Sequence, residues 1–324
     1  MKQIGSELKL LLVELAKKIT SSEAYFHSVN TCIALCGLQN TDDNVPEVKT
    51  LLTALLDKAI DASEQGIDRA TDREISMALY GLQKMGGLYS PIRSGSIGKS
   101  RVGGVATAVS DDGENNNELE APTSNPQYRK GNKAYYSANN EKDYIIQEVS
   151  SGPTTAVNAY NPNAKNKKAS LELRRALSYI KSLMQYQEGP FEAKRLAFAT
   201  CGLASVSCDI PEALEVITEL AKKSKDAWGD VTGHELGMCL HGLSGMRSDL
   251  KPVRELLQGL APVLRRCPNM RSTDVASAFL GLKGIRSGSK EVSEFIDAFA
   301  DLIERSVADG FIQLADTSEL CDVM

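Results

Sequence analysis

A recurring Gly-Leu pair is the feature that most constrains how this chain can fold. Its glycines are Gly37, Gly81, Gly202, Gly242 and Gly281, and three of the four intervals between them are close to 40 residues. A small residue stands three positions before each glycine, and mostly apolar residues stand two and six positions before it. Together with the leucine, these positions form the buried stripe of an amphipathic helix that ends at the pair.

A second, longer helix is predicted after each pair. Four such segments begin at Pro46, Pro211, Pro252 and Lys290, and three have proline near the first turn, where a missing N–H costs little. Ser6 to Ile19 has the same pattern. The sequence therefore predicts an all-α fold, an α-solenoid of stacked hairpins, each with a short helix A and a longer helix B. Pro262 should bend or shorten the third of these long helices.

One interval is much longer, because residues 86–169 separate the second helix A from its helix B. This stretch is rich in Gly, Ser, Asn and Lys and has no helical or strand period, so we expect a disordered insertion in an A–B loop. The predicted organisation is helical repeats at 1–85, the insertion at 86–169 and helical repeats at 170–324. Because Ser6 to Ile19 lacks a helix A and Thr317 to Met324 only starts one, we expect a fragment of a longer array.

Composition and motifs argue against several classes of protein. The net charge is −5, the apolar runs are short, and the seven cysteines form no C-x-x-C pair, so we expect an intracellular, reducing setting and no membrane span. GSIGKS at Gly95 to Ser100 is not a phosphate loop, and no catalytic motif is present. His234, Cys239 and His241 have unsuitable spacing for a metal. We therefore expect no enzyme, cofactor, metal or small-molecule substrate.

Basic residues gather near the ends of the long helices and in the A–B loops. Phosphates could follow such a basic ridge, although cations also favour helix C-termini because of the helix dipole. The candidate residues for RNA phosphates are Lys17, Lys18, Lys222, Lys223, Lys225, Arg265 and Arg266, with Arg247 and Arg286 in the loops.

Polar residues of varied type stand seven positions before each glycine. In a solenoid that reads one base per repeat, such positions do the reading. The alternative is local, because acids favour the first helical turn, and Thr71-x-x-Glu74 and Thr232-x-x-Glu235 are typical capping boxes. The candidate base-reading residues are Asn30, Glu74, Arg195, Glu235 and Asp274.

The repeat as a whole resembles a known family. Degenerate hairpins of about forty residues, with a small-x-x-Gly-Leu helix A, resemble the octotricopeptide-type repeats of organellar proteins. The resemblance implies a non-catalytic protein that binds single-stranded RNA in a chloroplast or mitochondrion and acts in RNA processing, stability or translation. HEAT and armadillo arrays have similar periods, so a protein-interaction scaffold is the alternative.

Overall fold

The computed structural model describes residues 5–24, 26–39, 41–64, 69–85, 169–286 and 288–312, and within these ranges it is helical without a strand. The short helices are α2 (Ser28–Gly37), α4 (Asp72–Gly81), α6 (Ala193–Cys201), α8 (Gly233–His241) and α10 (Ser272–Leu282). The longer ones are α1 (Ser6–Ser21), α3 (Pro46–Glu64), α5 (Leu171–Tyr186), α7 (Pro211–Ser224), α9 (Lys251–Arg266) and α11 (Lys290–Ala308). A 3₁₀ turn, η2 (Gly242–Gly245), follows α8. The predicted all-α array of hairpins is confirmed.

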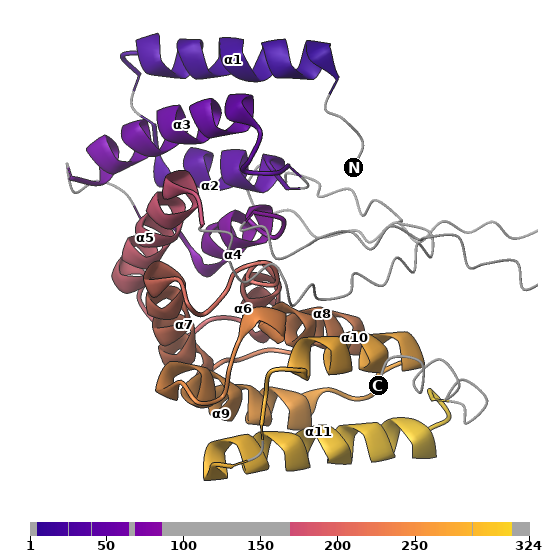
Figure 1. Cartoon of the computed structure of the whole chain (residues 1–324). Coiled ribbons are helices and arrows are strands. Elements are labelled where there is room, and N and C mark those ends of the chain that lie inside the picture. The colour runs from indigo at the N-terminus through magenta and orange to yellow at the C-terminus, as the bar shows by residue number, and fades with distance from the viewer. Residues whose placement is uncertain are drawn as a thin grey trace, which may run out of the picture. The chain divides into compact units, whose positions relative to one another are not determined.

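The described helices form one compact unit made of two rows (Figure 1). The even-numbered A helices pack on one another in the order α2, α4, α6, α8 and α10, and the odd-numbered B helices pack in the order α1 to α11. Neighbouring B helices run in the same direction, as contacts between α5 and α7 show. Arg174 contacts Glu212 at the starts of these two helices, and Lys223 contacts Gln187 at their ends. The array is therefore a stack of hairpins in which each contacts its neighbours.

Helix α4 contacts both α5 and α6, so the hairpin of α4 and α5 forms although its two helices are far apart in the sequence. The predicted insertion at 86–169 lies outside the described residues except for Ala169, which packs against the core just before α5. The start of a helix A expected at Thr317 to Met324 also lies outside them. Among the described helices, none has the length and apolar composition that a membrane span requires.

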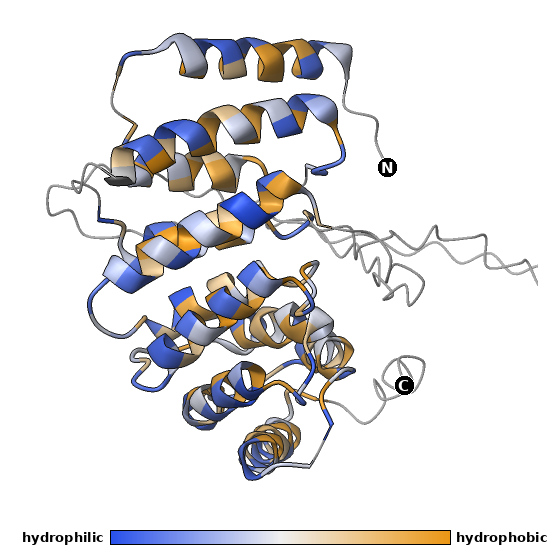
Figure 2. Cartoon of the chain, turned by 60° about the vertical axis from the view of Figure 1, so that its left-hand side comes forward, coloured by the Kyte–Doolittle hydropathy of each residue, from blue (hydrophilic) through white to orange (hydrophobic). Residues whose placement is uncertain are grey.

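The helices carry hydrophobic and hydrophilic residues along their whole length (Figure 2). The hydrophobic ones at helical spacing are buried in the core, as Leu256, Leu257 and Leu260 are in α9. Burial of a leucine or valine side chain contributes about 1.5–3 kcal/mol, so this core is the main source of stability.

The glycines of the last four Gly-Leu pairs lie against the backbone of the preceding A helix. A Cβ built on Gly81, Gly202, Gly242 or Gly281 would stand 1.9 to 2.2 Å from a carbonyl oxygen of that helix. These oxygens belong to Leu35, Leu79, Thr200 and Leu240, each two positions before the preceding glycine. We call this contact the glycine seat. Neighbouring A helices approach each other backbone to backbone at these glycines, since any side chain there would keep the backbones apart.

Pro262, which the sequence predicted would bend or shorten its helix, does not end it. Helix α9 continues through Pro262 to Arg266, and its 16 residues lie within the range of 14 to 19 found for the other long helices. Pro262 is exposed, while Val263 and Leu264 beyond it are buried in the core. Packing of these two side chains holds the last turn and offsets the hydrogen bond that proline cannot make.

Candidate RNA-binding surface

Some of the predicted phosphate-binding cations hold the array together. The Lys223 ammonium donates hydrogen bonds to the carbonyl of Gln187, at the end of α5, and to that of Gly189 at 3.1 Å. Arg266 donates to the carbonyl of Ala227, just after α7, at 2.7 Å. Each cation satisfies carbonyl groups that have no partner within the preceding B helix.

Two further cations, which the sequence analysis did not single out, make the same contact. Lys58 donates to the carbonyl of Ser22 at 2.7 Å, and Arg305 to that of Arg265 at 3.4 Å. We call all four contacts carbonyl staples. Lys58 and Lys223 both stand 21 residues after a repeat glycine, and Arg266 and Arg305 both stand 24 residues after one. The two positions are about one helical turn apart, so this register is the signal that could have identified the staples.

Three more residues of the ridge are paired with nearby carboxylates. Lys17 lies 2.7 Å from Glu14, Lys222 lies 2.8 Å from Glu219, and Arg247 contacts Asp209 at 3.1 Å and Asp249 at 3.5 Å. The ridge cations that are exposed and donate no side-chain hydrogen bond within the described part of the chain are Lys18, Lys225, Arg265 and Arg286. The structure therefore leaves fewer than half of the predicted cations open to phosphate.

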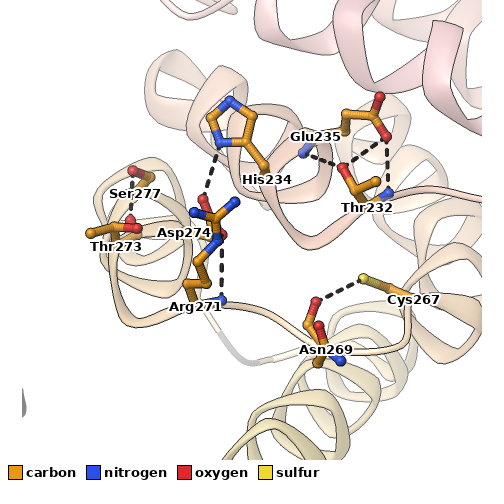
Figure 3. Close-up of polar contacts among 9 residues, drawn as sticks. All are labelled: Thr232, His234, Glu235, Cys267, Asn269, Arg271, Thr273, Asp274 and Ser277. Carbon is orange, nitrogen blue, oxygen red and sulfur yellow. Dashed lines mark hydrogen bonds and ion pairs between the residues drawn. The ribbon is translucent and has the colours of Figure 1, made fainter. Parts of the chain in front are cut away.

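The predicted base-reading carboxylates cap the starts of their own helices. The backbone N–H of Thr71 donates to Glu74, that of Thr232 to Glu235, both at 2.9 Å, and that of Arg271 to Asp274 at 3.3 Å. Figure 3 shows the latter two caps, with His234 reaching Asp274 at 3.1 Å. The predicted capping boxes at Thr71 and Thr232 are confirmed. Because the Glu235 and Asp274 side chains are buried, the local explanation accounts for both.

The two other candidates for base reading have no capping role. Asn30 is exposed on α2, and half-buried Arg195 on α6 pairs with Glu192 at 3.3 Å. Of the set, Asn30 is exposed and Glu74 and Arg195 are half-exposed, whereas Glu235 and Asp274 are buried.

A different set of A-helix residues is turned toward solvent. Positions eight, four and one before each glycine lie on one side of the helix, because they are spaced by four and three residues. We call them the A-helix stripe, and all but Cys201 are at least partly exposed. From α2 to α10 the stripe consists of Val29, Ile33 and Cys36; Arg73, Met77 and Tyr80; Lys194, Phe198 and Cys201; His234, Met238 and His241; and Thr273, Ser277 and Leu280.

The stripe combines basic groups with flat or polarisable apolar groups in its three central helices. It begins with Arg73, Lys194 or His234 and continues, one turn later, with Met77, Phe198 or Met238. The Tyr80 and Phe198 rings meet edge to face across α4 and α6, with 5.7 Å between their centroids. Lys194 also reaches Glu235 of the next A helix at 2.9 Å. Such rings offer stacking surfaces for bases, and such cations attract phosphates.

Burial decides the protonation of His241 and Cys201, the last stripe residues of their helices, and of the nearby Cys239. It lowers the pKa of His241 below 6.5, against a hydrogen bond to the Ser277 backbone that raises it, so the imidazole is neutral at pH 7. Burial also raises the pKa of Cys201 and of Cys239 to about 12, which keeps both thiols protonated and unreactive. Cys201 is a buried side chain of the packed interior.

Within the described ranges, no cluster of three His, Cys, Asp or Glu side chains is placed to hold a metal ion. Comparison of the chain with protein-family models, with curated proteins and with solved structures found no match.

Proposed function

We propose that this chain is a non-catalytic binding protein that holds single-stranded RNA along the A-helix stripe. The observation that carries the proposal is the repetition of one chemical pattern in α4, α6 and α8: a basic side chain followed, one turn later, by Phe or Met. All three repeats offer an apolar surface for a base, and Arg73 offers a cation for a phosphate, whereas Lys194 and His234 already pair with Glu235 and Asp274. The resemblance to octotricopeptide-type repeats supports the same ligand, and on that basis we propose a role in RNA processing, stability or translation in a chloroplast or mitochondrion.

The binding track proposed here differs from the ridge that the sequence suggested. The carbonyl staples occupy Lys223 and Arg266, and nearby carboxylates pair with Lys17, Lys222 and Arg247. Arg73, in contrast, stands half-exposed on the stripe. The A-helix stripe therefore combines the cation of Arg73 with stacking groups, whereas the ridge offers cations alone.

A protein-interaction scaffold is the second candidate function. Ile33, Met77 and Met238 are half-exposed apolar residues of the stripe. Methionine surfaces adapt to the apolar face of a partner helix, and an array of hairpins presents them in a row. The net charge of −5 favours a protein ligand over RNA.

A titration of the full chain with fluorescently labelled, random-sequence single-stranded RNA at several salt concentrations tests the proposal. Each phosphate contact should add about −0.7 to the slope of log affinity against log salt. Arg73→Gln should reduce that slope, and Phe198→Ala should weaken binding by about 1–3 kcal/mol for a lost stacking contact.

Lys225→Gln and Arg265→Gln are the matched controls, because these exposed cations belong to the ridge and not to the stripe. We expect both to bind RNA like the unchanged chain. Equal losses in the ridge and stripe variants would place the RNA elsewhere. If the chain binds RNA no better at low salt than an unrelated acidic protein, the RNA proposal fails and the scaffold becomes the leading function.

A further inference from the structure

Helix α1 is built like an internal B helix of the array. Its sequence follows that of α3 at an offset of 40 residues, so Leu8, Leu11 and Leu15 correspond to Val48, Leu51 and Leu55. The three residues of α3 are buried, and α3 packs on α1. Their counterparts in α1 are 45%, 54% and 41% exposed. Helix α1 thus carries the apolar stripe with which a B helix meets a preceding B helix.

Residues equivalent to those of two other repeat contacts, the glycine seat and the carbonyl staple, are also present at this end. Gly37 is the counterpart of the four seated glycines, but a Cβ built on it would meet nothing within 4 Å. Lys18 corresponds to the staple residue Lys58 at the same offset of 40 residues, and its side chain is exposed. Glycine seat, staple and apolar stripe therefore all lie open on the face formed by α1 and α2, which we call the N-face.

The face formed by α10 and α11, the C-face, has the complementary features. The residue two positions before the glycine supplies the carbonyl of each seat, and it is fully buried at Leu35, Leu79, Thr200 and Leu240. Its last counterpart, Phe279, is 39% exposed. On α11, Ile296, Ile303 and Val307 lie on one side of the helix and are exposed or half-exposed.

The two faces also carry charges of opposite sign. Helix α11 carries the carboxylates of Glu291, Glu294, Asp297, Asp301 and Glu304 against only two cations. Helix α1 has Lys17 and Lys18 in its last turns. If two B helices stack in the same direction, as they do within the chain, these lysines meet the end of α11 that bears Glu304.

We propose that the N-face of one copy of this chain stacks on the C-face of a second copy by the same contacts that join its own repeats. Gly37 then takes the carbonyl of Phe279 as its seat, and Lys18 staples the end of α11. The interface is head-to-tail, so each added copy leaves one N-face and one C-face open and the assembly grows with concentration. This self-association needs no RNA and does not depend on the proposed function.

Sedimentation velocity of the full chain over a range of concentrations tests the inference, together with two variants that each alter one face. Leu11→Asp changes the N-face, and Ile296→Asp changes the C-face. Both residues are exposed in the single chain, so far-UV circular dichroism should show unchanged helicity. We expect the unchanged chain to form species that grow with concentration and each variant alone to sediment as a monomer.

The mixture of the two variants is the decisive measurement. Each variant retains one intact face, so an equimolar mixture should form a 1:1 dimer and nothing larger. Gly37→Leu gives a second N-face variant that fills the open seat with a side chain. Leu171→Asp is the matched control, because Leu171 is 66% exposed at the start of α5 and lies on neither face.

Three outcomes would overturn the inference. One is an unchanged chain that stays monomeric at every concentration. A second is assembly that Leu11→Asp and Gly37→Leu both leave intact, which would indicate a symmetric contact of two C-faces. The third is a mixture of the two face variants that remains monomeric.

Discussion

Gly242 lies against the backbone carbonyl of Thr200, 42 positions earlier in the chain, so closely that a Cβ on the glycine would stand 2.1 Å from that oxygen. The obstacle is main chain on both sides, which cannot turn away as a long side chain can. The distance between α6 and α8 therefore depends on the absence of one side chain.

Replacing Gly242 by alanine should destabilise the array, although alanine is the better helix former. The steric conflict with Thr200 should cost about 1–3 kcal/mol, and the gain in helix propensity is only about 1 kcal/mol. Urea unfolding followed by circular dichroism measures the difference. Gly37→Ala, made where nothing lies within 4 Å, should be neutral or stabilising when compared at low protein concentration. Equal effects of the two substitutions would disprove the glycine-seat account.

Lys223→Met should lower the free energy of unfolding by about 1 kcal/mol, because it removes the donor to the Gln187 and Gly189 carbonyls while keeping most of the apolar stem. Lys225→Met, two residues later and exposed, is the control and should have little effect. Urea midpoints of the two variants give the comparison. If Lys225→Met costs as much as Lys223→Met, helix-end charge rather than the staple is responsible.

His241 should make the array less stable as the pH falls. Burial lowers its pKa in the folded chain below the value of 6.5 that it has when unfolded, so the unfolded chain binds more protons. Stability is therefore lost as the pH falls from about 7 through 6.5 and below. His241→Leu, which introduces the residue that α10 has at this position, should flatten that part of the profile. His234→Gln should leave the loss in place, and thermal melts at several pH values can distinguish the two.

Glu235 should stabilise the array in the opposite pH range. Burial raises the pKa of its carboxyl, but hydrogen bonds from Thr232 and the nearby Lys194 outweigh burial and bring the pKa below 4.5. This stabilisation is present above pH 4.5 and is lost as the pH falls through the lower, folded-state value. Glu235→Gln should therefore cost about 1 kcal/mol at pH 7 and less at pH 3. Glu304→Gln, the same substitution at an exposed position, is the control.

Local pattern was sufficient to predict the helices of the array. The Gly-Leu pairs predicted the ends of α2 at Gly37 and α4 at Gly81, and Thr232 with Glu235 predicted the start of α8. These signals act within one or two helical turns, so the sequence contains them directly. The length of α9 was not predictable from Pro262 alone, because buried Val263 and Leu264 decide it through contacts with other helices.

The candidate site was harder to predict from the sequence than the helices were. A lysine at the end of a helix has the same local sequence whether it faces water, as Lys225 does, or staples a carbonyl of the preceding repeat, as Lys223 does. Only the partner 36 residues away distinguishes them. Similarly, the sequence predicted that Glu235 caps the first turn of its helix. It did not predict that the Glu235 carboxylate would be buried. The ligand itself remains a prediction.

The glycine seats join main chain to main chain, so the step from one A helix to the next does not depend on which side chains are displayed. Residues of the A-helix stripe such as Met77 and Met238 take no part in the seats and can be exchanged without changing that step. The backbone therefore fixes the spacing of successive A helices, while the side chains of the stripe are free to vary. If the stripe binds a ligand as proposed, ligand preference can change through substitutions in one hairpin at a time.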